Sequence, residues 1–399
     1  MTSQISPVLM SFSCFLLLSG CLSPLALERA VMQYDEKIHR VEANMLLLNI
    51  ARASQNIPIH FTTVPNIAAT FDFRSTAGFG AQLFADPTEG DQANFYNLNL
   101  AASVAESPTI FITPVQGEEF TKRLLTPMDE SKFEFLVHQG VGPAVVLRMM
   151  ARPIVIENSD KRIWLPNSPH HIESYKEFRR RILHLAALYE MGILDVGYLD
   201  FEEPWPMPTN ERISPKEISV AFESGYQWAN TKQPQKALLR KKVLGRLLIA
   251  NYNPAELSND ERLALNRRAQ EFPRDFILVD IRPDSPGGDY SLQGWIKLRS
   301  FKAVLEFLGR GISKEPEFDV TKDSRTGKVL RNPAKTLEIV ESPHQPDTAA
   351  FTVEFNNQVF SIGSESQWNL EAFEVLSQLF QMTVTDVAKV PRPSITIAK

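Results

Sequence analysis

The chain has 399 residues, 43% of them hydrophobic and 22% charged, which is enough for roughly two to three globular domains. The formal net charge of -5 and the isoelectric point near 5.9 exclude a general basic field that would hold nucleic acid or an anionic membrane surface. Cys14 and Cys21 are the two cysteines and lie near the N-terminus, so the body of the chain has neither a disulfide framework nor a cysteine metal site.

The N-terminal segment has the features of an exported lipoprotein. Residues 8–18 form an apolar run of signal-peptide length, shorter than the roughly 20 residues that a membrane-spanning helix needs. The tetrapeptide Leu18-Ser19-Gly20-Cys21 follows, and it resembles the lipobox at which bacterial lipoproteins are lipidated and cleaved. This resemblance implies that Leu18, Ser19 and Gly20 are read by the signal peptidase and that Cys21 carries the lipid.

A lipid on Cys21 would fix the cellular address of the protein. Two or three acyl chains, at about 0.8 kcal/mol for each buried CH₂, make attachment effectively permanent. Residue 22 is Leu and not Asp, which by resemblance to the sorting rule of bacterial lipoproteins predicts the periplasmic face of the outer membrane. Residues 1–7 depart from the pattern, because they lack the Lys or Arg that usually opens such a signal.

A heptad pattern after the anchor predicts a long helix over residues 26–54. Apolar residues recur there at alternating spacings of four and three, as in a coiled-coil seam. The seam consists of Leu27, Val31, Tyr34, Ile38, Val41, Met45 and Leu48. Two interpretations stay open: the seam pairs with another copy of the chain, or it packs onto the chain's own domain.

From residue 67 the apolar period changes to two, which is typical of β-strands. Two alternating runs on either side of the turn-rich residues 86–91 predict a β-hairpin over residues 67–105. Each run reaches the roughly 9–11 residues that a membrane-crossing strand needs. Half-buried strands of soluble antiparallel sheets alternate in the same way, so both environments stay open.

The rest of the chain predicts shorter elements. Strands are predicted at residues 110–113, 243–252, 276–281, 351–355 and 358–362, the last two joined by a tight turn at Asn356-Asn357. Helices are predicted at residues 174–189, after the capping box at Ser258, and around residues 301–308 and 373–380. Thr126 and Pro127 predict one more helix start, as N-cap and first helical residue.

These elements predict an α+β fold in which antiparallel hairpins pack on amphipathic helices, preceded by the long N-terminal helix. The predicted organisation is a signal peptide (1–20), an anchor and heptad helix (21–55), an α+β domain with the long hairpin (56–230), an α/β segment (231–312), a loop or linker (313–347) and a C-terminal hairpin and helix (348–399).

Catalytic motifs are missing from the sequence. It contains no Gly-x-Ser-x-Gly elbow, no phosphate-binding loop and no His-Glu-x-x-His zinc motif. Glu202 and Glu203 lie close to Trp205, a combination that glycosidases use for acid catalysis with a sugar stacked on the indole. We predict no catalytic residue, no cofactor and no metal, and keep an envelope glycan hydrolase as an alternative.

Residues 44–52, 107–109, 113–120 and 376–380 resemble a family of uncharacterised proteobacterial envelope lipoproteins, which implies an envelope address and no particular activity. The expected function is a non-enzymatic scaffold or binding component of a cell-envelope assembly. Its expected partners are the membrane, through the lipid on Cys21, and other envelope proteins or further copies of the chain, without nucleic acid. An alternative is a subunit of an oligomeric outer-membrane pore that uses the hairpin 67–105.

Overall fold

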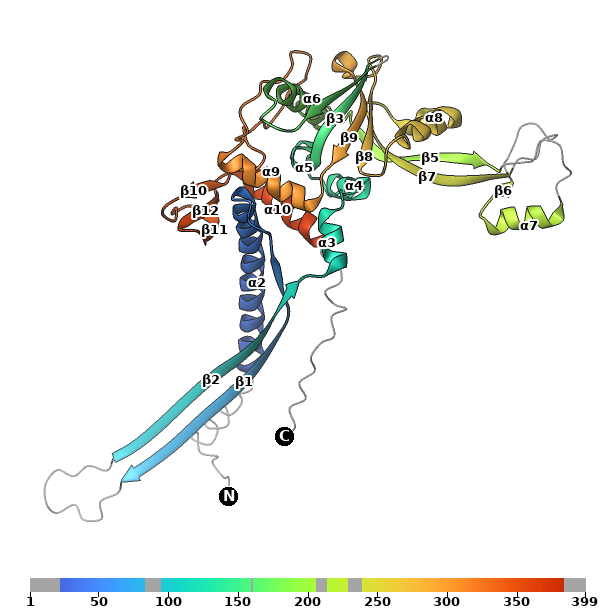
Figure 1. Cartoon of the computed structure of the whole chain (residues 1–399). Helices are drawn as coiled ribbons and strands as arrows, with labels where there is room; N and C mark the ends of the chain where they lie inside the picture. The colour runs from blue at the N-terminus through green and yellow to red at the C-terminus, as the bar shows by residue number, and fades with distance from the viewer. Residues whose placement is uncertain (1–21, 83–94, 159–160, 206–213, 229–238, 384–399) are drawn as a thin grey trace, which may run out of the picture. The chain divides into compact units, whose positions relative to one another are not determined.

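The computed structural model describes residues 22–82, 95–158, 161–205, 214–228 and 239–383 (Figure 1). They form an α+β fold with antiparallel strands and a long N-terminal helix, as predicted. The contacts within the chain divide it into two compact units: unit 1 contains residues 1–45, 60–115 and 387–399, and unit 2 contains residues 46–59 and 116–386. Among the described helices, none combines the length and the apolarity needed to cross a bilayer.

Unit 1 contains the first part of helix α2 (Leu22–Ser54) and a long hairpin. The extent of α2 confirms the helix predicted over residues 26–54. Strands β1 (Phe61–Gln82) and β2 (Phe95–Val115) pair antiparallel as a two-stranded sheet, which confirms the hairpin and lengthens it at its base. The separate strand predicted at residues 110–113 is wrong, because these residues continue the ladder of β2.

Unit 2 is built on a mixed sheet in the order β4-β3-β9-β8-β7-β5. Its strands are β3 (Ala151–Asn158), β4 (Lys161–Pro166), β5 (Asp195–Pro204), β7 (Leu239–Ala250), β8 (Phe276–Ile281) and β9 (Leu292–Leu298), with β6 (Gln227–Trp228) paired to β7. Neighbours run antiparallel except β7 and β8. The sheet joins strands from the segments predicted separately as 56–230 and 231–312, because β5 pairs with β7.

Helix α8 (Asn259–Ala269) connects the two parallel strands and covers part of the sheet. The predicted capping box is present: the hydroxyl of Ser258 accepts the backbone N–H of Glu261, whose carboxylate accepts the backbone N–H of Ser258. Such a cap contributes about 1 kcal/mol to helix stability. It fixes the point at which the chain turns from β7 into α8.

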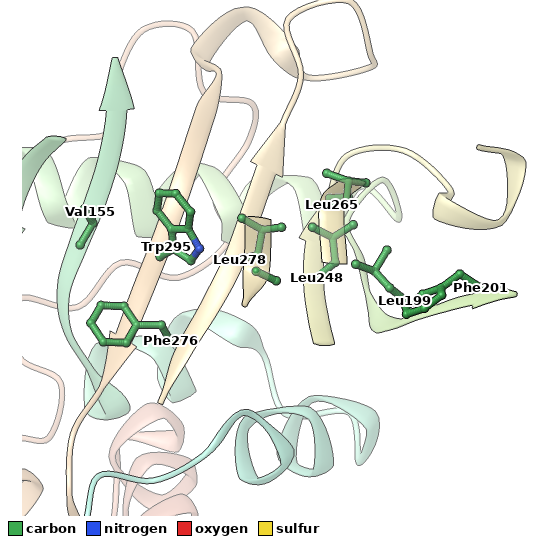
Figure 2. Packing of buried hydrophobic residues seen from close by; sticks show 10 residues of the cluster. Val155, Leu199, Phe201, Leu248, Leu265, Phe276, Leu278 and Trp295 are labelled. Carbon is green, nitrogen blue, oxygen red and sulfur yellow. The ribbon is translucent and has the colours of Figure 1, made fainter. Parts of the chain in front are cut away.

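The core of this sheet lies against α8 (Figure 2). Leu265 of α8 belongs to one buried cluster with Leu248 of β7, Leu278 of β8 and Trp295 of β9. All six residues of β8 are buried, as expected for a strand that is covered on both faces. The strand predicted at residues 276–281 is thereby confirmed.

The remaining helices are α3 (Glu118–Leu125), α4 (Glu130–His138), α5 (Pro143–Met150), α6 (Ile172–Glu190), α7 (Pro215–Glu223), α9 (Phe301–Ser313) and α10 (Gln367–Gln381), with short 3-10 turns η1 (Pro254–Glu256) and η2 (Gly288–Tyr290). The helix start predicted at Thr126 is wrong. Thr126 ends α3, and the next residues are extended because Met128 donates its N–H to the Arg299 carbonyl at 2.9 Å. Helix α4 begins only after Asp129.

Near the C-terminus a three-stranded sheet has the order β10-β12-β11. It consists of β10 (Val340–Ser342), β11 (Ala349–Phe355) and β12 (Gln358–Gly363). The predicted tight turn is confirmed, since Asn356 and Asn357 have φ values of 49° and 60°. Asparagine tolerates this left-handed conformation better than most residues, and a two-residue hairpin turn with the favoured twist requires it.

Within unit 2, a buried carboxylate holds the long loop between α9 and β10 against α5 and α6. Glu317 accepts the hydroxyl of Tyr175 at 2.7 Å and lies 3.4 Å from a guanidinium nitrogen of Arg148 and 3.7 Å from one of Arg179. Both arginines also donate to loop carbonyls, including that of Ala334. Burial alone would raise the pKa of Glu317, but the two positive charges outweigh it and lower the pKa. The carboxylate is therefore ionised at neutral pH.

Replacement of Glu317 by Gln should destabilise unit 2 by about 3–5 kcal/mol, because Arg148 and Arg179 would remain buried without their counter-ion. The measurement is urea unfolding of the purified full-length chain. The matched control is Glu338→Gln, which removes an exposed carboxylate from its pair with half-buried Lys335 and should cost at most about 1 kcal/mol. Equal unfolding midpoints for the two variants would show that Glu317 does not hold the loop.

Candidate functional site

The hairpin β1–β2 is the feature of unit 1 that most needs a partner. A strand of 22 residues, such as β1, extends about 70 Å at roughly 3.3 Å per residue. The two strands form a sheet of their own, and an isolated two-stranded sheet is at best marginally stable in water. A ribbon of this length therefore needs packing partners beyond its own two strands, and α2 supplies one contact near the base, between Met45 and Thr62.

The register of the hairpin sorts its residues into two chemically different faces. Directly opposed residues lie on the same face of a sheet, and the face changes with each step along the strand. One face carries the pairs Phe73–Val104, Ser75–Ala102, Ala77–Leu100, Phe79–Leu98 and Ala81–Tyr96. The other carries Arg74–Ser103, Thr76–Ala101, Gly78–Asn99 and Gly80–Asn97. The ribbon thus has an apolar face and a face of small and polar residues.

Apart from Ser75, the face with Phe73 is apolar over a length close to that of a membrane-crossing strand. It begins at Phe73, because the preceding pair on this face, Phe71–Glu106, includes an acidic residue, and it runs to Ala81. These nine positions, 73 to 81, extend about 26 Å along the strand, and their number reaches the roughly 9–11 residues of a tilted membrane-crossing strand. Aromatic residues occur at both ends, as Phe73 and Tyr96, and aromatic girdles border the lipid-facing band of membrane-crossing strands.

The prolines of the hairpin lie outside this stretch. Pro65, Pro108 and Pro114 are all nearer the base than Phe73, and the register shifts between Thr63 and Asn66. Proline has no N–H and cannot donate to a neighbouring strand. Every residue of the apolar stretch therefore carries a backbone donor, and both outer edges of the ribbon could pair with further strands.

The predicted seam of α2 is exposed at two of its described positions and half-buried at the others. Val31 is 55% exposed and Val41 50% exposed, whereas Tyr34, Ile38, Met45 and Leu48 are half-buried. Leu27 lies in α2, and its side chain is outside the described residues. Met45 contacts Thr62, whose N–H lies 3.0 Å from the Met45 sulfur. Within unit 2, α2 instead buries a different face, made of Leu46, Leu47, Ile50 and Ala51.

The acids that suggested a hydrolase do not converge. Glu202 and Glu203 are consecutive on β5 and so lie on opposite faces of the sheet. The carboxylate of Glu202 forms an ion pair with Arg240 at 3.1 Å, and its backbone exchanges hydrogen bonds with the Asn259 side chain at the start of α8. The hydrogen bonds between Asn259 and Glu202 hold the start of α8 against β5. The two carboxylates do not face each other beside Trp205 as a glycosidase would require.

Other candidate sites in the described residues are weak. No group of three His, Cys, Asp or Glu side chains there could hold a metal ion. A groove of about 500 Å³ lies where α3 and α4 meet the end of α10. Its lining alternates basic and acidic side chains, with Arg123 paired to Glu119 and Lys132 near Asp129, so its charge selects no class of ligand.

The lipidation site predicted at Cys21, its recognition residues Leu18, Ser19 and Gly20, and the predicted turn at 86–91 lie outside the described residues. Sequence reasoning found the alternation of the hairpin but not its register, which depends on how two segments meet across the turn. Comparison of the chain with protein-family models, curated proteins and solved structures yields no match.

The register can be tested by paired cysteines. Thr76→Cys with Ala101→Cys should form a disulfide on mild oxidation, because these residues are directly opposed and opposed Cα atoms lie about 4.5–5.5 Å apart. The control, Thr76→Cys with Ala105→Cys, keeps the same face but shifts one cysteine by about 13 Å. Gel mobility of the membrane fraction without reductant reports the bond. Efficient bonding of the control pair would refute the register.

Proposed function

We propose that this protein is a lipid-anchored envelope protein whose copies assemble into an oligomeric outer-membrane pore, with each copy contributing the hairpin β1–β2. The observation that carries the proposal is the register, which gives nine consecutive positions with one apolar and one polar face. That length equals the roughly 9–11 residues of known membrane-crossing strands, and the alternation matches their division between lipid and water.

The proposal requires several copies, because one hairpin cannot enter hydrocarbon alone. The outer edges of a lone β1–β2 ribbon carry N–H and C=O groups without strand partners, and each such group costs several kcal/mol in lipid. Hairpins from neighbouring copies, side by side, would pair these edges. The absence of proline from positions 73–81 and 96–104 supports this pairing, since no donor is missing there.

In such a ring the two faces of the hairpin would have different neighbours. The face with Phe79 and Leu100 would meet lipid, and the face with Thr76, Asn97 and Asn99 would surround water. The glycines at positions 78 and 80 keep the water-facing side small. The lipid on Cys21 would hold the copies on one membrane and raise their effective concentration before the hairpins insert.

A non-enzymatic scaffold is the second candidate function, and an exposed aromatic cluster in unit 2 favours it. Val220 and Phe222 of α7 and Trp228 of β6 are all exposed, and the two rings meet edge to face with centroids 6.0 Å apart. Exposed aromatic side chains are enriched at protein interfaces. In this case the body would be water-soluble once the lipid is removed.

Membrane fractionation separates the two functions. The chain with Cys21→Ala, exported by a cleavable signal peptide, should stay in the membrane as a large assembly on a native gel, because the hairpins and not only the lipid hold it. The same chain without residues 67–105 should be released as a soluble species. Release by Cys21→Ala alone would support the scaffold and reject the pore.

A lysine placed on each face tests which side meets lipid. Leu100→Lys puts a charge at the centre of the apolar stretch and should cost about 2–4 kcal/mol of insertion, with a corresponding loss of detergent-resistant assemblies. Asn99→Lys, one residue away on the polar face, should assemble normally and change the single-channel conductance in a planar bilayer. Equal assembly of the two variants would contradict a bilayer location.

A further inference from the structure

The seam of α2 contains a pattern of charges that the proposed pore does not use. In heptad terms, Val31, Ile38 and Met45 occupy position a, and Leu27, Tyr34, Val41 and Leu48 occupy position d. Three of the four flanking e positions are acidic, Glu28, Asp35 and Glu42, and the fourth is Asn49. The flanking g positions are Ala30, Lys37 and Asn44. These flanking residues decide which orientation of two paired helices is favourable.

The charges favour parallel over antiparallel pairing. In an antiparallel pair, e positions face e positions, so the three acids of one helix would meet those of the other. In a parallel pair, each g residue faces the e residue five positions later on the partner helix, and Lys37 would face Glu42 of the other copy. The β-branched Val31 and Ile38 at position a also suit a parallel two-stranded coil.

Exposure and anchoring agree with this orientation. Val31 and Val41 are among the exposed large hydrophobic residues, and Lys37 is exposed while Glu42 is half-buried. The residues of α2 that belong to unit 2 bury a face with Leu46 and Ile50, which are not seam residues. A lipid at residue 21, just before α2, would also point all copies on one membrane in the same direction.

We propose that α2 helices of two copies of this chain associate in parallel through the seam, with Lys37 of each copy opposite Glu42 of the other. The inference rests on the self-assembly in the proposed function but not on entry of the hairpin into a bilayer. The exposed part of the seam covers only about two heptads, which are marginal for a free coiled coil. Shared anchoring on one membrane supplies the effective concentration that so short a seam needs.

Cysteine crosslinking in the full-length membrane-bound chain tests the seam. Val41→Cys at position d should form an intermolecular disulfide on mild oxidation, because equal d positions meet in a parallel pair. Met32→Cys, which is more exposed but lies at position b, should crosslink poorly. Adding Lys37→Glu to Val41→Cys places like charges opposite each other and should lower the dimer yield about five-fold. Further addition of Glu42→Lys should restore it.

The rescue distinguishes a broken interface from a misfolded helix. Equal crosslinking from residues 32 and 41, or no effect of Lys37→Glu, would overturn the proposal. The same variants in the chain without residues 67–105 test the α2 pairing independently of the proposed pore. Loss of Val41→Cys dimers after that deletion would overturn an independent seam, whereas their persistence would support the seam whatever fractionation shows for the hairpin.

Discussion

The backbone N–H and C=O groups on the outer edges of β1 and β2 limit the environments in which the hairpin is stable. The strands have 22 and 21 residues and form a sheet with each other only, among the described residues. Their outward N–H and C=O groups need water or another strand. In water these groups are hydrogen-bonded, but the apolar face is then exposed to water. In lipid the apolar face is covered, but the edge N–H and C=O groups then have no hydrogen-bond partner. In the proposed pore, lateral contact between copies would meet both demands at once, so the proposal joins oligomerisation and membrane entry in one hypothesis.

Unit 2 meets the same demands within its own chain. Its central strands are flanked on both sides, β8 is buried throughout, and α8 is seated by the exchange of hydrogen bonds between Asn259 and the backbone of Glu202. Its buried carboxylate Glu317 is matched by the guanidinium groups of Arg148 and Arg179. Polar groups that elsewhere suggest catalysis here stabilise the packing, which leaves the surface of the unit, and above all its exposed aromatic residues, as the region available to partners.

Local patterns were readable in the sequence, and pairings between distant segments were not. The helical extent of α2, the capping box at Ser258 and the turn at Asn356-Asn357 each depend on neighbouring residues, and each was predicted. The helix start predicted at Thr126 failed because a distant carbonyl, that of Arg299, holds the next residues extended. The alternation of apolar residues in each strand of the hairpin was predicted from the sequence. That the apolar residues of both strands lie on the same face follows only from the register.

The coincidence of those two faces limits how the hairpin can change in evolution. Insertion of one residue into either strand between its base and the apolar stretch would exchange the faces of everything beyond it on that strand and set Phe against Asn. Two residues added to one strand alone would keep the faces but displace the partners by about 7 Å. Tolerated length changes should therefore add or remove equal numbers of residues in both strands, so that related hairpins differ by even numbers of residues outside their turns. An odd number in each strand would keep the pairs but turn both faces over relative to the base of the hairpin.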